Sequence, residues 1–212
     1  MTRKIFWQDP YLTALDAQVT EVAGAQVLLD QTILFAFSGG QESDAGTIAG
    51  YPVLQAAKRG LDIVYTLPAD NAIKVGDRVA TQLDWDRRYR LMRLHFAAEM
   101  VLQLIYQRCP GIVRTGAHIA PTKARIDFTS EHSLAPLLAG IAGDAQALID
   151  ADHPIVTAFS DAGAERRYWR VDGFAQMACG GTHPRRTGEI GGVLLKRRNP
   201  GRDRERVEIV LA

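Results

Sequence analysis

Residues 84–108, DWDRRYRLMRLHFAAEMVLQLIYQR, decide how this chain is organised. The stretch contains neither Gly nor Pro and is rich in good helix formers, so it predicts one long helix. Asp84 or Asp86 can cap its start, and Cys109-Pro110-Gly111 ends it. Helical spacing puts His95 and Glu99 on one face, beside an apolar stripe. We therefore expect a helix that packs on a core and carries polar groups along its buried edge.

The sequence before this helix has the pattern of strands rather than of a helix. From about residue 17 to 84, short apolar stretches alternate with turn residues, among them SGGQESDAG (38–46) and IKVGDRV (73–79), which is typical of strands and tight turns. Beyond the helix, the pattern predicts a second helix over 134–151 and strands in ARIDF, HPIVTAF, YWRVDGF, GGVLLKRR and RVEIVLA. The predicted organisation is a β-rich domain over 1–84 and an α+β domain over 85–212.

Composition narrows the class of protein. The chain has 212 residues, of which 47% are hydrophobic and 23% charged, as in one or two compact domains. The first residues form no signal peptide, and no apolar run approaches the length of about 18 residues that spans a membrane. We expect a cytoplasmic protein without membrane contact. Cys109 and Cys179 lie in different settings and do not form a disulfide framework, so we expect a chemical role for at least one thiol.

Charge is unevenly distributed along the chain. Residues 85–125 carry eight basic and two acidic side chains, and residues 185–212 carry eight basic and four acidic ones. The remaining segments, 1–84 and 126–184, are net acidic. Two basic segments suit a phosphate backbone if the fold brings them together, but charge runs on their own are more often solvated faces. The leading candidates for RNA contacts are Arg87, Arg88, Arg185, Arg186, Arg197 and Arg198.

Two residue pairs have the spacing of metal ligands. His95 and Glu99 are four apart on the predicted helix, and Cys179 and His183 are four apart in CGGTH, whose adjacent glycines permit a tight turn. A thiolate, imidazoles and a carboxylate suit Zn²⁺ better than a hard cation. A helical histidine on its own is more often a core or surface residue, so the cysteine pair is the stronger signal.

These residues resemble a known family. CGGTHPRRTGEIG (179–191) is similar to the C-terminal motif of the alanyl-tRNA synthetase editing domain, and MRLHFAAEMVL (92–102) resembles its helical HxxxH motif. FAFSGGQESDAGTI (35–48) is similar to the family's glycine-rich loop, and GAHIAPTKARIDF (116–128) resembles the strand segment after the zinc helix. The similarity extends from about residue 36 to the C-terminus and points to the free-standing, medium-length editing proteins.

The resemblance implies a fold and an activity. It implies a small N-terminal β-barrel followed by a two-layer α+β editing domain that binds zinc and the acceptor end of alanine-specific tRNA, rather than DNA. The implied reaction is hydrolysis of the ester that links serine or glycine to the terminal adenosine. This hydrolysis is needed because an active site that accepts alanine discriminates only weakly against the smaller glycine and against serine. The number of subunits does not follow from it. The implied substrate-binding residues are Ser38, Gly39, Gly40, Gln41 and Thr182, with Gln41 and Glu99 as the catalytic ones.

The sequence departs from the family's pattern at the helix. Glu99 replaces the second histidine, and Phe96 and Ala98 stand where hydroxyl residues are usual, which removes partners for a serine side chain. Glu99 is either a fourth ligand, giving a neutral zinc site, or a general base on water beside a three-ligand site. Two other functions remain open: a non-catalytic tRNA-binding module with a degenerate metal site, and an unrelated zinc hydrolase of small esters.

Overall fold

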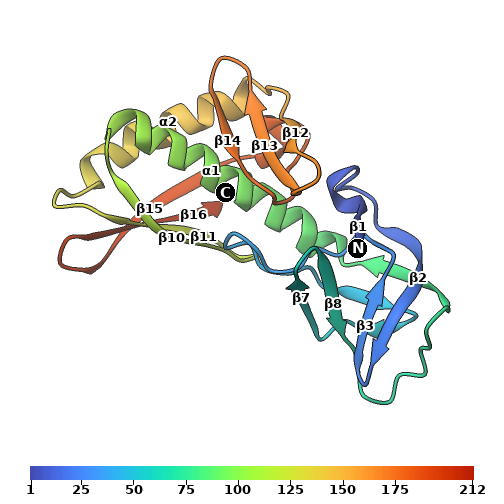
Figure 1. The fold of residues 1–212 in the computed structure, drawn as a ribbon. Helices are drawn as coiled ribbons and strands as arrows, with labels where there is room; N and C mark the ends of the chain where they lie inside the picture. The colour runs from blue at the N-terminus through green and yellow to red at the C-terminus, as the bar shows by residue number, and fades with distance from the viewer. The chain divides into compact units, whose positions relative to one another are not determined.

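A computed structural model describes residues 1–212 and contains two helices and several antiparallel sheets (Figure 1). The chain forms two compact units, residues 1–38 with 42–89 and residues 39–41 with 90–212. The expected mixture of helices and antiparallel strands is confirmed. The boundary that we expect between independent domains, at residue 84, stays a prediction. Neither helix has the combination of length and apolar content that crossing a membrane would require.

The first unit is built on a curled, seven-stranded antiparallel sheet with the strand order β6-β5-β9-β2-β3-β8-β7. The sheet forms a half-barrel, because β6 and β7 remain its edges. Its strands are β2 (Ala14–Ala23), β3 (Gln26–Leu29), β5 (Gly46–Ile48), β6 (Tyr51–Pro52), β7 (Gln55–Arg59), β8 (Asp62–Thr66) and β9 (Arg78–Leu83). The short strands β1 (Arg3–Lys4) and β4 (Gln31–Thr32) pair in parallel beside a 3-10 turn at Ile5–Trp7.

Helix α1 (Trp85–Arg108) matches the predicted helix closely. Asp84 caps it, since the Asp84 carboxylate accepts a hydrogen bond from the Arg87 amide at 3.0 Å. The helix is buried almost all round between residues 91 and 105, so it forms the centre of a core rather than an amphipathic surface.

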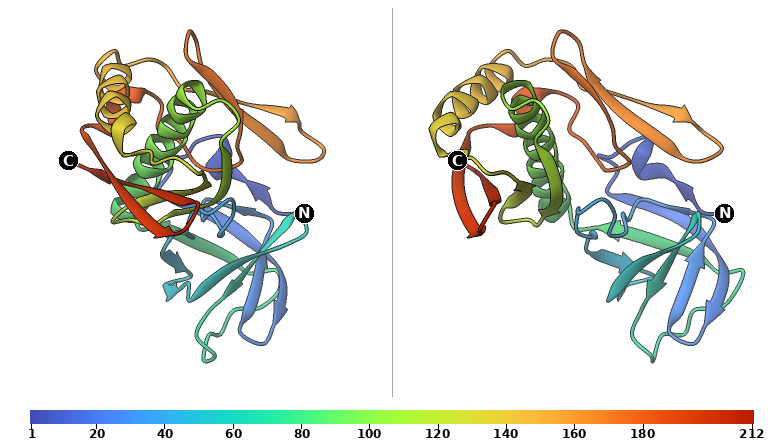
Figure 2. Two further views of the ribbon diagram at one scale, coloured as in Figure 1. Left: turned by 90° about the vertical axis from the view of Figure 1, so that its left-hand side faces the viewer. Right: turned by 60° about the vertical axis from the view of Figure 1, so that its left-hand side comes forward.

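The second unit packs its sheets and its other helix on α1 (Figure 2). One sheet has four strands in the order β10-β11-β16-β15, and the other has three in the order β12-β13-β14. Phe96 of α1 contacts Trp169 of the smaller sheet edge to face, with ring centroids 5.0 Å apart. The elements are β10 (Val113–Ile119), β11 (Ala124–Thr129), α2 (Ala135–Asp150), β12 (Val156–Asp161), β13 (Arg166–Val171), β14 (Ala175–Ala178), a 3-10 turn (Thr187–Ile190), β15 (Val193–Gly201) and β16 (Arg204–Leu211).

Candidate metal centre

Four side chains from the two predicted pairs converge in the second unit. The donor atoms of His95, Glu99, Cys179 and His183 all lie within 4.8 Å of one another. His183 Nε2 is 3.0 Å from one Glu99 oxygen, and His95 Nε2 is 3.3 Å from the other oxygen and 3.3 Å from Cys179 Sγ. A tetrahedral zinc ion with bonds of about 2.0–2.3 Å separates its donors by about 3.3–3.8 Å. The three shortest separations are close to this range and the four donors all lie within 4.8 Å, so small side-chain movements would bring them to one ion.

The cluster is buried, and its electrostatics are strongly coupled. Burial alone would lower the pKa of His95, but the Glu99 carboxylate and the Cys179 thiolate outweigh burial and raise that pKa well above its usual value. The pKa of His183 is raised against burial in the same way, by Cys179 and Glu99. Burial opposes the charge of Glu99, yet His95 and His183 hold the pKa of Glu99 far below its ordinary range. The pKa of Cys179 is lowered by the two histidines, against burial and Glu99.

A buried set of two imidazolium groups, one carboxylate and one thiolate has no net charge. Replacing the two imidazole protons with one divalent cation leaves that sum unchanged. The exchange therefore avoids the desolvation cost of placing new net charge in a buried site. His183 Nδ1 is buried without a hydrogen-bond partner, which is unusual in a core. The donor set and its burial fit a zinc ion.

The loop that carries Cys179 and His183 follows β14 and is closely packed. The Cys179 amide donates to the Arg167 carbonyl at 2.9 Å, which continues the pairing of β14 with β13 by one more hydrogen bond. A Cβ at Gly181 would lie 2.1 Å from His95 Cε1 and 2.8 Å from Gln41 Oε1. Neither Gly180 nor Gly181 has a positive φ. The chain bends at Gly181, and a glycine is required there because His95 leaves no room for a side chain.

The TGEIG segment fastens this loop to the end of α2. Thr187 Oγ1 donates to the Leu148 carbonyl at 2.7 Å, and the Gly188 amide donates to Asp152 Oδ1 at 3.1 Å. The Glu189 carboxylate accepts the amides of Arg185 and Arg186. These contacts give the motif a structural role close to the metal-binding loop.

The predicted substrate residues fall in different environments. Gly39 lines a small pocket beside His95 and Glu99. Gly40 and Gln41 are tied to β10, because Gly40 O accepts the Ile119 amide at 2.8 Å and Gln41 forms a parallel bridge with Ile119. The side chains of Gln41 and Thr182 are almost completely buried. Ser38 belongs to the first unit, where its hydroxyl accepts a hydrogen bond from Lys58 Nζ at 3.0 Å.

The same pocket contains residues that the sequence did not single out. It is lined by Gly39, His95, Ala98, Glu99, Leu102, Arg114, Ala117, Ile119 and Ile126. Most of these side chains are small or aliphatic, and the free volume between them is about 20 Å³, room for about one water molecule. The exposed Arg114 adds a positive charge. Arg114 lies on β10, outside every motif of the sequence, so no local signal identifies it.

The six arginines predicted to contact RNA are mostly engaged by acidic partners. Arg87 pairs with Glu42 and Arg186 with Asp152. In the four-stranded sheet, Arg197 pairs with Glu205 and Arg198 with Glu208, the latter at 3.1 Å. Arg185 is exposed. The sheet thus brings basic strands together, but acidic residues neutralise part of their charge.

The prediction that Arg88 contacts RNA is wrong, because its side chain is buried. Its side chain is 0% exposed, and Arg88 Nε donates to Asp44 Oδ1 at 2.9 Å. Its terminal nitrogens donate to the carbonyls of Pro10 and Ile33. A guanidinium enclosed in this way is a buried structural ion pair and has no surface for a phosphate.

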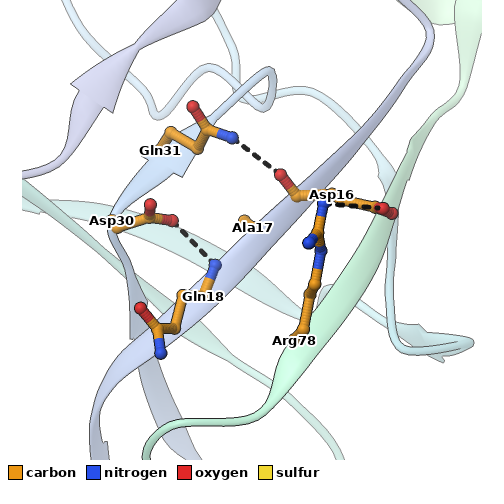
Figure 3. Close-up of a pocket in the computed structure, with 6 residues that line it drawn as sticks. All are labelled: Asp16, Ala17, Gln18, Asp30, Gln31 and Arg78. Carbon is orange, nitrogen blue, oxygen red and sulfur yellow. Dashed lines mark hydrogen bonds and ion pairs between the residues drawn. The ribbon is translucent and has the colours of Figure 1, made fainter.

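A separate hollow lies on the half-barrel of the first unit (Figure 3). Its polar groups mainly satisfy one another: Gln31 Nε2 donates to the Asp16 carbonyl, and the Gln18 amide donates to Asp30, both at 2.7 Å. Arg78 faces Asp16 at 3.6 Å. This hollow holds no convergent set of nucleophile, base or ligand.

The fold and the site define a protein with a largely buried His, Glu, Cys and His group that could hold a metal ion, beside a small pocket. No protein-family model matches the chain. It is 32% identical to the alanyl-tRNA editing protein AlaX-M of Pyrococcus horikoshii, over 100% of this chain and 98% of the relative. It is 31% identical to AlaX-M of Methanosarcina acetivorans, over 100% and 99%. An alanine–tRNA ligase of Ignicoccus hospitalis is 34% identical over 92% of this chain and 24% of the ligase. The chain belongs to the family of AlaX-M alanyl-tRNA editing proteins.

Proposed function

We propose that this protein is a hydrolase that deacylates mischarged tRNA, removing serine or glycine attached to alanine-specific tRNA. The observation that carries the proposal is the convergence of His95, Glu99, Cys179 and His183 beside a small pocket, in a chain similar to AlaX-M proteins over its whole length. The tRNA acceptor end is the proposed substrate, because only that end carries the aminoacyl ester.

We further propose that the bound ion is Zn²⁺, held by His95, Cys179, His183 and Glu99. A zinc ion supplies a Lewis acid that can polarise an ester carbonyl or make water more acidic. The residues of the chain provide the rest of the site. Gly39, Ala98, Leu102 and Ile126 line the small pocket beside the cluster, and this apolar lining would exclude water from an aminoacyl group bound at its mouth.

Glu99 is proposed as a ligand rather than a general base. Its two oxygens lie 3.3 Å from His95 Nε2 and 3.0 Å from His183 Nε2, so the carboxylate faces both imidazoles. A general base must face the substrate, and a carboxylate engaged on both sides has little freedom to do so. Glu99→His should then keep metal and activity. If Glu99 is instead the base, the same change should retain metal but lower the deacylation rate by about 10²–10⁴.

RNA contacts are proposed for the exposed or half-exposed arginines, with Arg88 removed from the set. The proposed contacts are Arg87, Arg185, Arg186, Arg197, Arg198 and Arg114. Because most of these are paired with carboxylates, each phosphate contact would exchange one partner for another and contribute less than a free charge. We also propose that residues 1–84 act as a separate β-rich domain and residues 85–212 as a two-layer editing domain.

The test is deacylation of seryl-, glycyl- and alanyl-tRNA together with metal analysis of the purified protein. We expect release of serine or glycine, about one zinc per chain, and loss of both in Cys179→Ala and His183→Ala. Bound zinc without deacylation of any charged tRNA would favour a non-catalytic tRNA-binding module. Activity on small esters with no salt-dependent affinity for tRNA would instead favour an unrelated esterase.

A further inference from the structure

The Gln41 side chain is enclosed at the metal centre. It is 0% exposed, and its backbone is held by the bridge to Ile119 and by the hydrogen bond from the Ile119 amide to Gly40 O. Gly40 has a φ of +91°, and a Cβ there would lie 2.5 Å from the Ala117 carbonyl oxygen. The segment 39–41 is therefore fixed against β10, and the Gln41 amide has one direction in which to point.

The orientation of that amide follows from its partners. The Thr182 backbone N–H, which can only donate, lies 3.3 Å from Gln41 Oε1, so the atom at this position is the carbonyl oxygen. The other amide atom, Nε2, donates to Thr182 Oγ1 at 3.0 Å. His95 Nδ1 is 2.5 Å from the same Oε1. Since Oε1 is an acceptor, His95 Nδ1 carries a proton and donates it to Gln41.

This hydrogen bond assigns the roles of the two ring nitrogens of His95. With Nδ1 protonated toward Gln41, the lone pair available to a metal is on Nε2, which is 3.3 Å from both Cys179 Sγ and a Glu99 oxygen. Metal-binding histidines usually donate their second N–H to an acceptor, which fixes the tautomer and the ring direction, and loss of that acceptor typically weakens metal binding 10–100-fold.

We infer that Gln41 is a positioning residue that holds His95 for metal binding, and that it does not contact the substrate. The inference rests on the proposed metal site. The Gln41 oxygen already accepts two hydrogen bonds, and no part of the side chain is exposed to meet an aminoacyl group. Gln41 also joins Thr182 to the cluster, so one amide links the Gly39–Gln41 segment, α1 and the CGGTH loop.

The test compares Zn²⁺ binding by the full-length wild type, Gln41→Met, Gln41→Glu and Thr182→Val, by competition with a chromophoric chelator. Gln41→Met keeps the length of the side chain but removes the acceptor, and we expect it to bind Zn²⁺ about 10–100-fold more weakly. Gln41→Glu keeps an acceptor for His95 and should bind more tightly than Gln41→Met. Thr182→Val removes the acceptor of Gln41 Nε2 but keeps the Thr182 amide that donates to Oε1, so its affinity should lie between those of Gln41→Met and the wild type.

A second readout follows the hydrogen bond directly. In zinc-loaded protein labelled with ¹⁵N-histidine, the His95 Nδ1 proton should give a protected, downfield resonance that moves further downfield in Gln41→Glu and is lost or shifted upfield in Gln41→Met. Unchanged zinc affinity in Gln41→Met would overturn the inference. If that variant fails to fold, an unchanged resonance in Gln41→Glu would overturn it equally. Neither readout uses deacylation, so an inactive protein that passes both would contradict only the proposed function.

Discussion

The closest approach at the metal centre gives a sharp prediction for Gly181→Ala. The added Cβ would lie 2.1 Å from His95 Cε1 and 2.6 Å from His95 Nδ1. An ordinary carbon–carbon contact is about 3.5 Å, so the ring or the loop must move by about 1.4 Å. Zinc–ligand distances tolerate only about ±0.2 Å. The alanine should therefore remove His95 from the ligand set.

The expected loss of zinc affinity is larger than the loss from removing a residue that only contacts a ligand. We expect Gly181→Ala to lose more than the 10–100-fold in zinc affinity that an outer contact contributes. Overpacking of a buried site should also lower the free energy of unfolding by about 1–3 kcal/mol. Affinity is measured by chelator competition, and stability by urea unfolding of the metal-free protein.

Gly180→Ala is the matched control. A Cβ at Gly180 meets nothing within 4 Å, and its φ is not positive, so neither affinity nor stability should change appreciably. If Gly181→Ala binds zinc as tightly as the wild type does, while Gly180→Ala behaves as expected, then His95 is not held where the structure has it and the reasoning fails.

Three further predictions address the pocket, the ion pairs and the protons. Ala98→Ser adds a hydroxyl to the pocket wall and should raise kcat/KM for seryl-tRNA relative to glycyl-tRNA by about 2–10-fold, the worth of one hydrogen bond; an unchanged ratio would exclude this wall from specificity. Arg88→Met should lower the free energy of unfolding by about 3–5 kcal/mol in chemical denaturation, because it leaves Asp44 buried and unpaired, and no loss of stability would contradict the structural role. Zinc binding to the metal-free protein near pH 6.5 should release at least one proton, since the pKa values of His95 and His183 are raised and Nε2 of each ring must be deprotonated to bind. Zinc affinity should accordingly fall as the pH is lowered, and release of less than about one proton, measured with a pH indicator, would refute the charge assignment.

The sequence predicted the elements that local signals define. The long helix and its Asp84 cap, the second helix and most C-terminal strands were confirmed because propensity, capping and turn residues agree there. The convergence of His95 and Glu99 with Cys179 and His183 was also predictable, since each pair shares a local spacing. The roles of these residues in binding and catalysis stay predictions.

Other features could not be predicted because they depend on which side chains meet across long separations. Nothing in the local sequence distinguishes Arg88, buried against Asp44, from the half-exposed Arg87 next to it. Gly181 looks like a turn glycine, but the space that it leaves is taken by His95, 86 positions earlier. The motif predicts that Gln41 contacts the substrate, and nothing in the local sequence indicates that its amide is buried against His95 and Thr182. Such distinctions require the tertiary structure.

Glu99, in place of the family's second helical histidine, changes the net charge of the cluster. With Cys179 and three histidines, a bound dication would leave a net charge of +1 in a buried site, whereas Glu99 brings the sum to zero. A neutral site polarises water or a carbonyl less strongly. In the metal-free site the pKa shifts favour the charged forms of the carboxylate, the thiolate and both imidazoles, and these four charges also sum to zero. As the proposed fourth ligand, Glu99 would therefore keep the charge of the site the same with or without its ion, at the expense of Lewis acidity.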